Sequence, residues 1–158
     1  MQMRSRIKRT VNTRTVALVG LGPGAFTVEA ARRVGPGGSV VTVDIQPEMI
    51  AKVEQRVKES GLTNVETHIA SAYDLPLSDE SVDRAFVITV MAEIPDKPRS
   101  LAELRRVLRP GGVLSVTEEF LDPDYPFASE TIRRAEKAGF RLRGRYGNFW
   151  LYTLNFEK

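Results

Sequence analysis

The stretch Val16–Phe26, VALVGLGPGAF, places three glycines and a proline directly behind a run of apolar residues. The apolar run is typical of a buried strand, and residues 24–34, GAFTVEAARRV, follow with the spacing of an amphipathic helix. Glycine has no Cβ, so it suits a tight turn whose backbone a ligand must approach closely. The amino end of the helix behind such a turn favours negatively charged or polar ligand groups. The stretch therefore predicts a ligand-binding loop between a strand and a helix.

Strand-like and helix-like segments alternate along the rest of the chain. This alternation predicts an α/β fold, a three-layer Rossmann-like sandwich with a mostly parallel seven-stranded sheet and an antiparallel C-terminal hairpin strand. Since no segment resembles a linker or a repeat, we expect a single domain over residues 1–158, with residues 1–13 as a short basic N-terminal arm. Strands are expected at 14–19, 38–44, 64–70, 83–91 and 113–119, helices at 24–34, 46–61, 100–109 and 130–140, and the hairpin at 140–157.

Composition excludes several classes of protein. The 158 residues include no cysteine and a single histidine, His68, so thiolate and histidine-rich metal sites are excluded and no metal is expected. No apolar run approaches the roughly 20 residues of a membrane span, and a cytoplasmic protein is expected. Basic residues gather near both ends of a chain with a net charge of +3. RNA could bind there, but no aromatic-rich RNA motif accompanies them, which favours a solvated surface.

The glycine loop by itself fits two kinds of nucleotide. Gly20, Gly22 and Gly24 satisfy the G-x-G-x-G pattern of methyl-donor enzymes. With Ala25 they also satisfy the dinucleotide pattern G-x-G-x-x-G/A. Asp44 ends the second expected strand, where an acid can accept hydrogen bonds from ribose hydroxyls. A dinucleotide, a methyl donor and a purely structural turn all remain open at this point.

Over residues 16–119 the chain resembles the class I S-adenosylmethionine-dependent methyltransferases, most of all the ubiquinone and menaquinone biosynthesis branch. The resemblance implies S-adenosylmethionine as the cofactor and methyl transfer to a small-molecule acceptor by in-line displacement. Four segments carry it in the family's order: VALVGLGPGAFT, VVTVDIQPEMI, GLTNVETHIASAYDLPLSDESVDRAFVITVMAEIPD and SLAELRRVLRPGGVLSVTE.

The resemblance also implies which residues hold the donor. The glycine loop would shape the pocket for the methionine part, Asp44 would bind the ribose hydroxyls, and Ile45 would lie against the adenine. In the SAYDLP segment, the Ala72 backbone and the Asp74 carboxylate would contact the adenine edge, and Met91 would line the channel near the sulfur. The implied donor-binding residues are Gly20, Leu21, Gly22, Gly24, Asp44, Ile45, Ala72, Tyr73, Asp74 and Met91.

Two departures from the family pattern bear on function. The family usually has an acid two residues before the first glycine, where this chain has Leu18. The ammonium group of the donor would then rely on backbone carbonyls, which predicts weaker binding. Relatives also carry helices before the first strand, where only about a dozen residues stand here. We therefore expect an open site, or one that a partner subunit closes in a homodimer.

Residues that orient or deprotonate the acceptor are expected where the fourth and fifth strands end. Glu93 is the favoured catalytic candidate, and Glu118, Glu119 and Tyr125 are further candidates. Because the donor is already activated, the protein mainly has to align the nucleophile, and the family has no single catalytic signature. His68 has no partner in sequence to orient it and is expected to be structural.

The C-terminal aromatic residues and two alternative functions complete the expectations. Trp150, Phe149 and Tyr152 are expected to pack in the core and at its edge rather than to form an acceptor cage.

An S-adenosylmethionine-binding protein without activity is one alternative function, favoured by Leu18. A nicotinamide-dependent dehydrogenase is the other, although the catalytic tyrosine and lysine or histidine that it needs are not evident.

Overall fold

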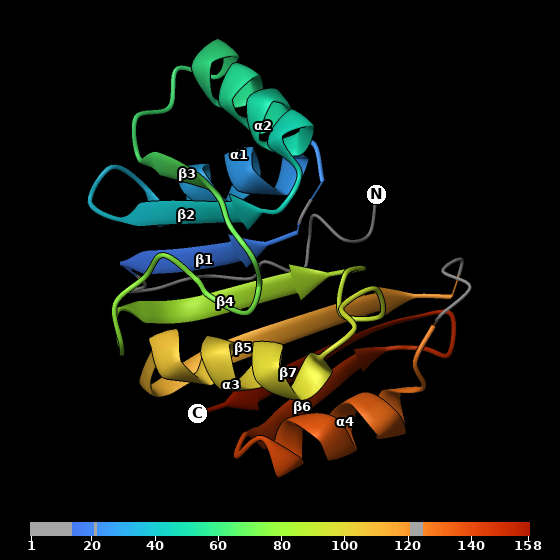
Figure 1. Ribbon diagram of the computed structural model, residues 1–158. Helices are drawn as coiled ribbons and strands as arrows, with labels where there is room; N and C mark the ends of the chain where they lie inside the picture. The colour runs from blue at the N-terminus through green and yellow to red at the C-terminus, as the bar shows by residue number, and fades with distance from the viewer. Residues whose placement is uncertain (1–13, 21, 121–124) are drawn as a thin grey trace.

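The computed structural model describes residues 14–20, 22–120 and 125–158 (Figure 1). The expected N-terminal arm, residues 1–13, lies outside the described residues. The elements in chain order are β1 (Thr15–Val19), α1 (Ala25–Val34), β2 (Ser39–Asp44), α2 (Pro47–Glu59), β3 (Val65–Ile69), β4 (Val82–Ile88), α3 (Lys97–Val107), β5 (Leu108–Glu119), α4 (Ala128–Lys137), β6 (Arg141–Gly147) and β7 (Leu151–Glu157).

The strands form a seven-stranded sheet in the order β3-β2-β1-β4-β5-β7-β6. The first five strands pair in parallel, and β7 lies antiparallel between β5 and β6. The strand order reverses between β1 and β4, and ligands of open α/β sheets bind outside the carboxyl ends of the strands at such a point. The predicted fold class is confirmed, including the antiparallel hairpin at the C-terminus.

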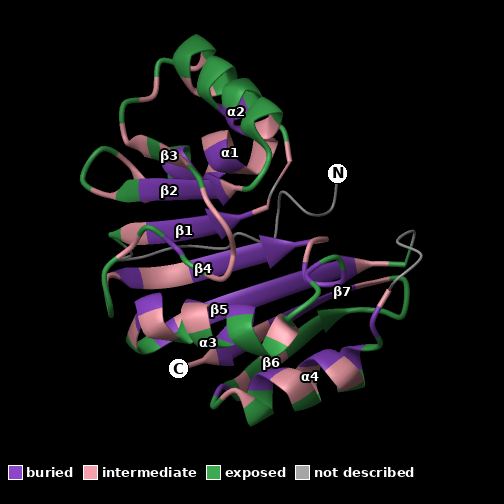
Figure 2. Cartoon of the chain, viewed as in Figure 1, coloured by how far each residue is buried: buried purple, intermediate pink, exposed green. Residues whose placement is uncertain are grey.

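Helices cover both faces of the sheet, as right-handed crossovers require. In Figure 1, α3 and α4 lie in front of the sheet, whereas α1 packs on the opposite face with α2 beside it. The central strands are buried on both faces over most of their length and are rich in apolar residues there. Figure 2 shows this as purple along most of β1 and β5 and along the second half of β4, whose start is pink.

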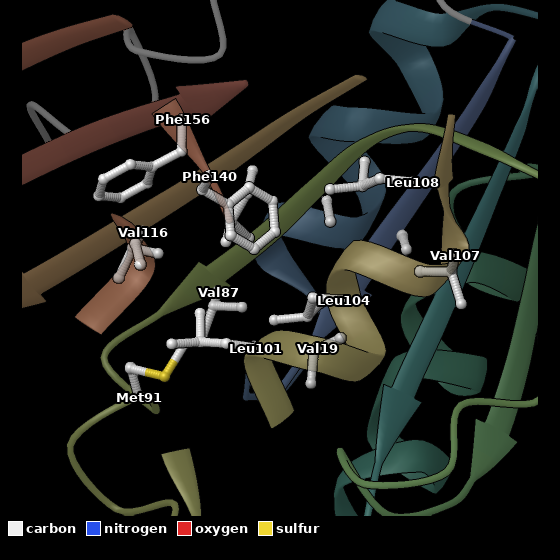
Figure 3. Packing of buried hydrophobic residues seen from close by; sticks show 14 of the residues in the cluster. Val19, Val87, Met91, Leu101, Leu104, Val107, Leu108, Val116, Phe140 and Phe156 are labelled. Atoms are coloured by element: carbon white, nitrogen blue, oxygen red, sulfur yellow. The ribbon is translucent and has the colours of Figure 1, made fainter. Parts of the chain in front are cut away.

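Alternate residues of β1 serve two separate hydrophobic clusters. Ala17 and Val19 face the larger cluster, in which Leu101 and Leu104 of α3 pack against the sheet (Figure 3). Leu18 belongs to the second cluster, where it packs with Ala30 of α1 and is 1% exposed. An acid at position 18 would face this apolar layer, so the core accounts for leucine there.

The end of α3 differs from the expectation. The sequence predicts a helix that continues to Pro110, but α3 ends at Val107 and β5 begins at Leu108. Leu108 is fully buried and pairs with Val82, and pairing resumes at Val113 opposite Arg84. The Pro-Gly-Gly segment therefore forms an irregularity inside β5, where proline and glycine are tolerated.

Candidate functional site

A cavity of about 550 Å³ lies at the carboxyl edge of the sheet, at the point where the strand order reverses. The ends of β1, β2 and β4 and the loops after β3 and β4 form its wall. The predicted residues in this wall are Gly20, Gly22, Asp44, Ile45, Ala72, Tyr73 and Glu93. Leu21, the remaining predicted residue between the first two glycines, lies outside the described residues.

The three glycines of the loop have different roles. Gly20 (φ +65°) donates its N–H to the Val43 carbonyl at 2.9 Å, which joins the loop to β2. Gly22 (φ +64°) lines the cavity, and a Cβ there would meet nothing within 4 Å. That glycine therefore leaves open the space that a side chain would take from a ligand.

Gly24 does not have the place in the donor pocket that the resemblance implied. It does not line the cavity but is buried at the amino end of α1, with φ +94°. A Cβ at Gly24 would lie 3.1 Å from the Cα of Val53 in α2. Its small size therefore permits close packing of α1 against α2 rather than close approach of a ligand.

The end of β2 presents an acid and an apolar side chain side by side. Asp44 Oδ1 accepts a hydrogen bond from the Gln46 N–H at 2.9 Å, which fixes the carboxylate at the start of α2. Within the described part of the chain, no hydrogen bond engages Asp44 Oδ2. Ile45 follows with its side chain 70% exposed at the cavity wall. The pair can hold a polar diol and a flat apolar ring at neighbouring positions.

The loop after β3 contributes Ala72 and Tyr73 to the cavity wall. The Tyr73 hydroxyl accepts a hydrogen bond from the Asp96 N–H at 2.9 Å, and the guanidinium of Arg99 lies 5.1 Å from the centre of its ring. Tyr73 therefore ties this loop to the amino end of α3. Asp74 is exposed and is not part of this wall, and its N–H bonds to the Ser71 carbonyl at 3.1 Å. The structure therefore does not bring its carboxylate into the cavity wall, where the resemblance implied it.

An ion-pair network anchors the same loop to α3. Arg106 pairs with Glu103 and with Asp79, each at 2.6 Å, and donates to the Leu75 carbonyl at 3.1 Å. Glu103 accepts a hydrogen bond from the Leu75 N–H at 2.8 Å. The hydrogen bond from Arg106 holds the pKa of Glu103 below its ordinary value. The network thus fixes the segment that follows the cavity wall.

The end of β4 supplies wall residues that the sequence analysis missed. Thr89 has φ +55° and donates its N–H to the Thr117 carbonyl of β5 at 2.8 Å, and Val90 follows it into the cavity wall. A positive φ is uncommon for a β-branched residue, and a threonine in sequence gives no sign of it. Glu93, the catalytic candidate, is exposed at the rim, with its N–H bonded to the Val90 carbonyl.

Met91 does not line the cavity, where the resemblance implied a place near the donor sulfur. Its side chain is 3% exposed and lies in the larger hydrophobic cluster rather than in the cavity wall. Figure 3 shows Met91 beside Leu101 and Val87. The positive φ at Thr89 ends the strand two residues before Met91 and changes the direction of the chain. The alternation expected for a strand through residue 91 therefore does not apply.

The other acceptor-side candidates lie one strand further along the sheet. Glu118 is fully buried opposite Tyr152, and Tyr125 donates a hydrogen bond to the Phe149 carbonyl. Burial raises the pKa of Tyr125. Tyr152 packs in the core, whereas Trp150 is 61% exposed and contacts the rings of Phe120 and Phe149 at the edge of the sheet.

His68 is separate from this region. It lies on β3 and contacts Glu66 at 2.5 Å, outside the cavity wall. The expectation that it has no role at the site agrees with this placement.

Comparison with known proteins identifies the family. The family model for the methyltransferase domain matches residues 16–112. The chain belongs to this methyltransferase family. The family is the class I S-adenosylmethionine-dependent group that the sequence resembles, and S-adenosylmethionine is its cofactor. The match begins within β1, just before the glycine loop, and includes the whole cavity wall.

Relatives of this methyltransferase domain include an arsenite methyltransferase of Halobacterium salinarum, 37% identical over 112 residues, which are 71% of this chain and 29% of the relative. The ubiquinone/menaquinone biosynthesis C-methyltransferase of Hahella chejuensis is 37% identical over 110 residues, 69% of this chain and 44% of the relative. The chain thus spans less than half the length of these curated relatives. A crystal structure of an S-adenosylmethionine-dependent methyltransferase from Aquifex aeolicus superposes with a TM-score of 0.85 at 25% identity, covering 91% of this chain and 81% of that one.

The cavity of this methyltransferase domain fits its cofactor. Its volume lies in the range of small-molecule sites. It combines the open side of Gly22, the fixed carboxylate of Asp44 and the apolar side chain of Ile45. These groups suit, respectively, an amino-acid chain, a ribose and a purine. None of the helices in the described ranges has the length and apolarity of a membrane crossing.

Proposed function

We propose that this chain is an S-adenosylmethionine-dependent methyltransferase acting on a small-molecule acceptor by in-line displacement. The observation that carries the proposal is the Asp44 carboxylate, fixed by the Gln46 N–H on the wall of a cavity whose other side is the glycine loop. A carboxylate there can accept both ribose hydroxyls, and charge-assisted hydrogen bonds are the stronger kind.

The other wall residues would contact different parts of the donor. Gly20 and Gly22 expose backbone to the amino-acid part, while Ile45 and the backbone of Ala72 lie where the adenine would be held. The Tyr73 hydroxyl accepts a hydrogen bond from the Asp96 N–H and so joins the loop after β3 to the end of the loop after β4. When bound, the sulfonium of the donor supplies the methyl group, which passes to the acceptor nucleophile while the electron pair of the broken C–S bond stays on sulfur.

Glu93 is the residue that we propose to accept a proton from the acceptor. It lies on the cavity rim, in the middle of the loop between β4 and α3 that starts with the strained Thr89. A carboxylate that is exposed at the rim can pass the proton on to water, so each cycle can restore it. Its function requires an acceptor whose nucleophilic atom carries a proton.

Donor binding without catalysis is the second candidate. Leu18 supports it, because that position faces the apolar layer under α1 and supplies no acid for the donor's ammonium group. The relatives named for arsenite and quinone methylation support a small-molecule acceptor instead. Homodimer formation and a cytoplasmic location stay predictions, and RNA binding stays the less favoured alternative to a solvated surface.

The test is calorimetric titration of the protein with S-adenosylmethionine, S-adenosylhomocysteine and NAD. We expect both adenosyl compounds to bind and NAD not to bind, since the cavity wall provides one ribose site. Methyl transfer is then assayed with a tritiated methyl group and a panel of small acceptors. Binding without transfer to any acceptor would support the second candidate, and binding of NAD alone would contradict both.

A further inference from the structure

The loop between β4 and α3, residues 89–96, forms one side of the cavity wall and carries Glu93 at the rim (Figure 1). Glu93 is exposed, whereas Ala92 and Ile94 on either side of it are each only 8% exposed. The Glu93 N–H bonds to the Val90 carbonyl at 3.0 Å. The backbone of this loop therefore decides whether the Glu93 carboxylate faces the cavity.

The ammonium group of Lys97 holds the backbone on both sides of Glu93. Lys97 Nζ donates to the Ala92 carbonyl and to the Ile94 carbonyl, at 3.0 Å each. The Ala92 carbonyl belongs to the peptide bond that leads into Glu93, and the Ile94 carbonyl to the peptide bond that leads into Pro95. Hydrogen bonds from a charged donor are stronger than those between neutral groups. One side chain thus fixes the two peptide bonds that enclose Glu93 and Ile94.

Lys97 stands at a position where a helix does not favour a cation. It is the first residue of α3, whose first turn carries no acidic residue, and the amino end of a helix has a partial positive charge. Lys97 is also half-buried and lines a small cavity with Met91 and Leu101, although lysine ammonium groups ordinarily lie in water. A local preference that is broken in this way is expected at functional sites. The two carbonyl partners account for this lysine, and helix formation does not.

We propose that Lys97 is a positioning residue of the methyl-transfer reaction, whose ammonium holds the loop so that the Glu93 carboxylate faces the reacting end of the donor. The proposal deepens the proposed function and rests on it. Glu93 accepts the proton that the acceptor loses as it gains the methyl group, and the electron pair of the broken C–S bond stays on sulfur. Lys97 is not part of the cavity wall, so it acts through Glu93.

The test compares sinefungin with S-adenosylhomocysteine in calorimetric titrations. Sinefungin is a donor analogue in which a carbon bearing an ammonium group replaces the sulfonium and its methyl group. A carboxylate that faces this position should favour sinefungin by about three- to fivefold, as for an ion pair that water partly screens. We expect the native protein to show this preference and Glu93→Gln to lose it. Equal affinities in the native protein would place Glu93 away from the reacting end and overturn the proposal, whereas the donor site of the proposed function would still be supported.

The decisive variants change Lys97 itself. Lys97→Met keeps the apolar stem but removes the ammonium, and we expect it to lose the preference for sinefungin as Glu93→Gln does. The double variant should lose no more than either single variant, because both remove the same interaction. Lys97→Arg should restore the preference, since a guanidinium can donate to two carbonyls. A preference that survives in Lys97→Met would overturn the proposal.

Arg109→Met is the matched control. Arg109 also donates to a loop carbonyl, that of Glu80 at 3.1 Å, and it pairs with Asp83 at 2.8 Å. Asp83 lies at the start of β4, at the edge of the sheet opposite to the cavity. Arg109→Met should therefore lower stability but keep the preference for sinefungin. An equal loss of preference in Arg109→Met and Lys97→Met would reduce the role of Lys97 to stability and overturn the proposal.

Amide hydrogen exchange separates the positioning role from the proposed function. The exchange rate of the Glu93 N–H should rise about tenfold or more in Lys97→Met, because a hydrogen-bonded charge is lost. The rate of the Ser100 N–H, which bonds to the Asp96 carbonyl at the start of α3, should stay the same. Binding of both compounds to the native protein with an unchanged Glu93 exchange rate in Lys97→Met would reject the positioning role alone. Binding of neither compound would reject the proposed function and with it the role of Lys97 in methyl transfer.

Discussion

The Cα of Gly20 faces the side chain of Val90 so closely that a Cβ on Gly20 would lie 2.7 Å from Val90 Cγ1 and 2.8 Å from Cγ2. Gly20 directly follows β1 and Val90 lies two residues beyond β4, so this contact joins the two strands at the point where the strand order reverses. The first glycine of the loop is thus required by packing against the segment after β4 as well as by its φ of +65°. Gly22, which also lines the cavity, has open space where its Cβ would be.

Gly20→Ala should destabilise the protein by more than the strain of a left-handed alanine alone. That strain costs about 1–2 kcal/mol, and crowding by Val90 should add about 1–3 kcal/mol. Gly61→Ala is the control, since Gly61 has φ +64° and nothing within 4 Å of a Cβ. Urea unfolding gives both values. If Val90→Ala does not recover part of the Gly20→Ala loss, the contact is not its cause.

Asp44→Asn should weaken S-adenosylmethionine binding by at least tenfold, because charge-assisted hydrogen bonds contribute about 1.5–3 kcal/mol each. The asparagine oxygen can still accept from the Gln46 N–H, so the fold should be retained. Asp74→Asn should leave the affinity unchanged, since Asp74 is exposed outside the cavity wall. Calorimetric titration measures both. The opposite order of effects would restore Asp74 to the site in place of Asp44.

Tyr73→Phe should lower stability by about 0.5–1.5 kcal/mol, the usual contribution of one hydrogen bond. It removes the hydroxyl that accepts from the Asp96 N–H and so loosens the joint between the loop after β3 and α3. Because that loop forms part of the cavity wall, donor affinity should fall several-fold. Tyr146→Phe provides a control on an exposed tyrosine. An unchanged donor affinity in Tyr73→Phe would show that the joint does not shape the cavity.

Stability should depend on pH through Glu103. The hydrogen bond from Arg106 lowers the pKa of Glu103 in the folded state, so its contribution is present above the unfolded pKa of about 4.3. It is lost as the pH falls through the lower folded pKa. The stability difference between the native protein and Glu103→Gln should therefore be largest near neutral pH and shrink in acid. Urea unfolding across this range measures it. Arg106→Met should reduce the pH-dependent part to the smaller contribution of the Leu75 N–H, and an unchanged pH dependence there would contradict the assignment.

Much of the fold could be predicted from the sequence because local patterns and burial agree. The alternation of β-branched runs with helical spacing gives the strands and helices of a doubly covered sheet, and the Gly147–Asn148 turn gives the hairpin. The end of α3 could not be predicted from proline and glycine alone. Leu108 pairs with Val82 and is fully buried, so tertiary pairing ended the helix before the Pro-Gly-Gly segment.

The site was predicted less completely, for a geometric reason. Gly20 and Ile45 directly follow strands and Asp44 is the last residue of one, so their place at the carboxyl edge follows from the sequence order. Met91 lies in the core rather than in the cavity wall because the backbone turns at Thr89 with a positive φ. The threonine in the sequence does not signal this turn. Asp74 lies outside the cavity wall, in a turn that its N–H closes with the Ser71 carbonyl.

By itself, the sequence determined the alternating elements, the glycine loop and the acid that ends β2, because periodicity and backbone freedom are local properties of the chain. Only the tertiary structure decided that Gly24 serves helix packing, that Thr89 and Val90 complete the cavity wall, and that the rings of Phe120 and Trp150 contact each other. These outcomes depend on which strand ends become neighbours. Contacts between residues 30 or more positions apart are set by the packing of the whole sheet.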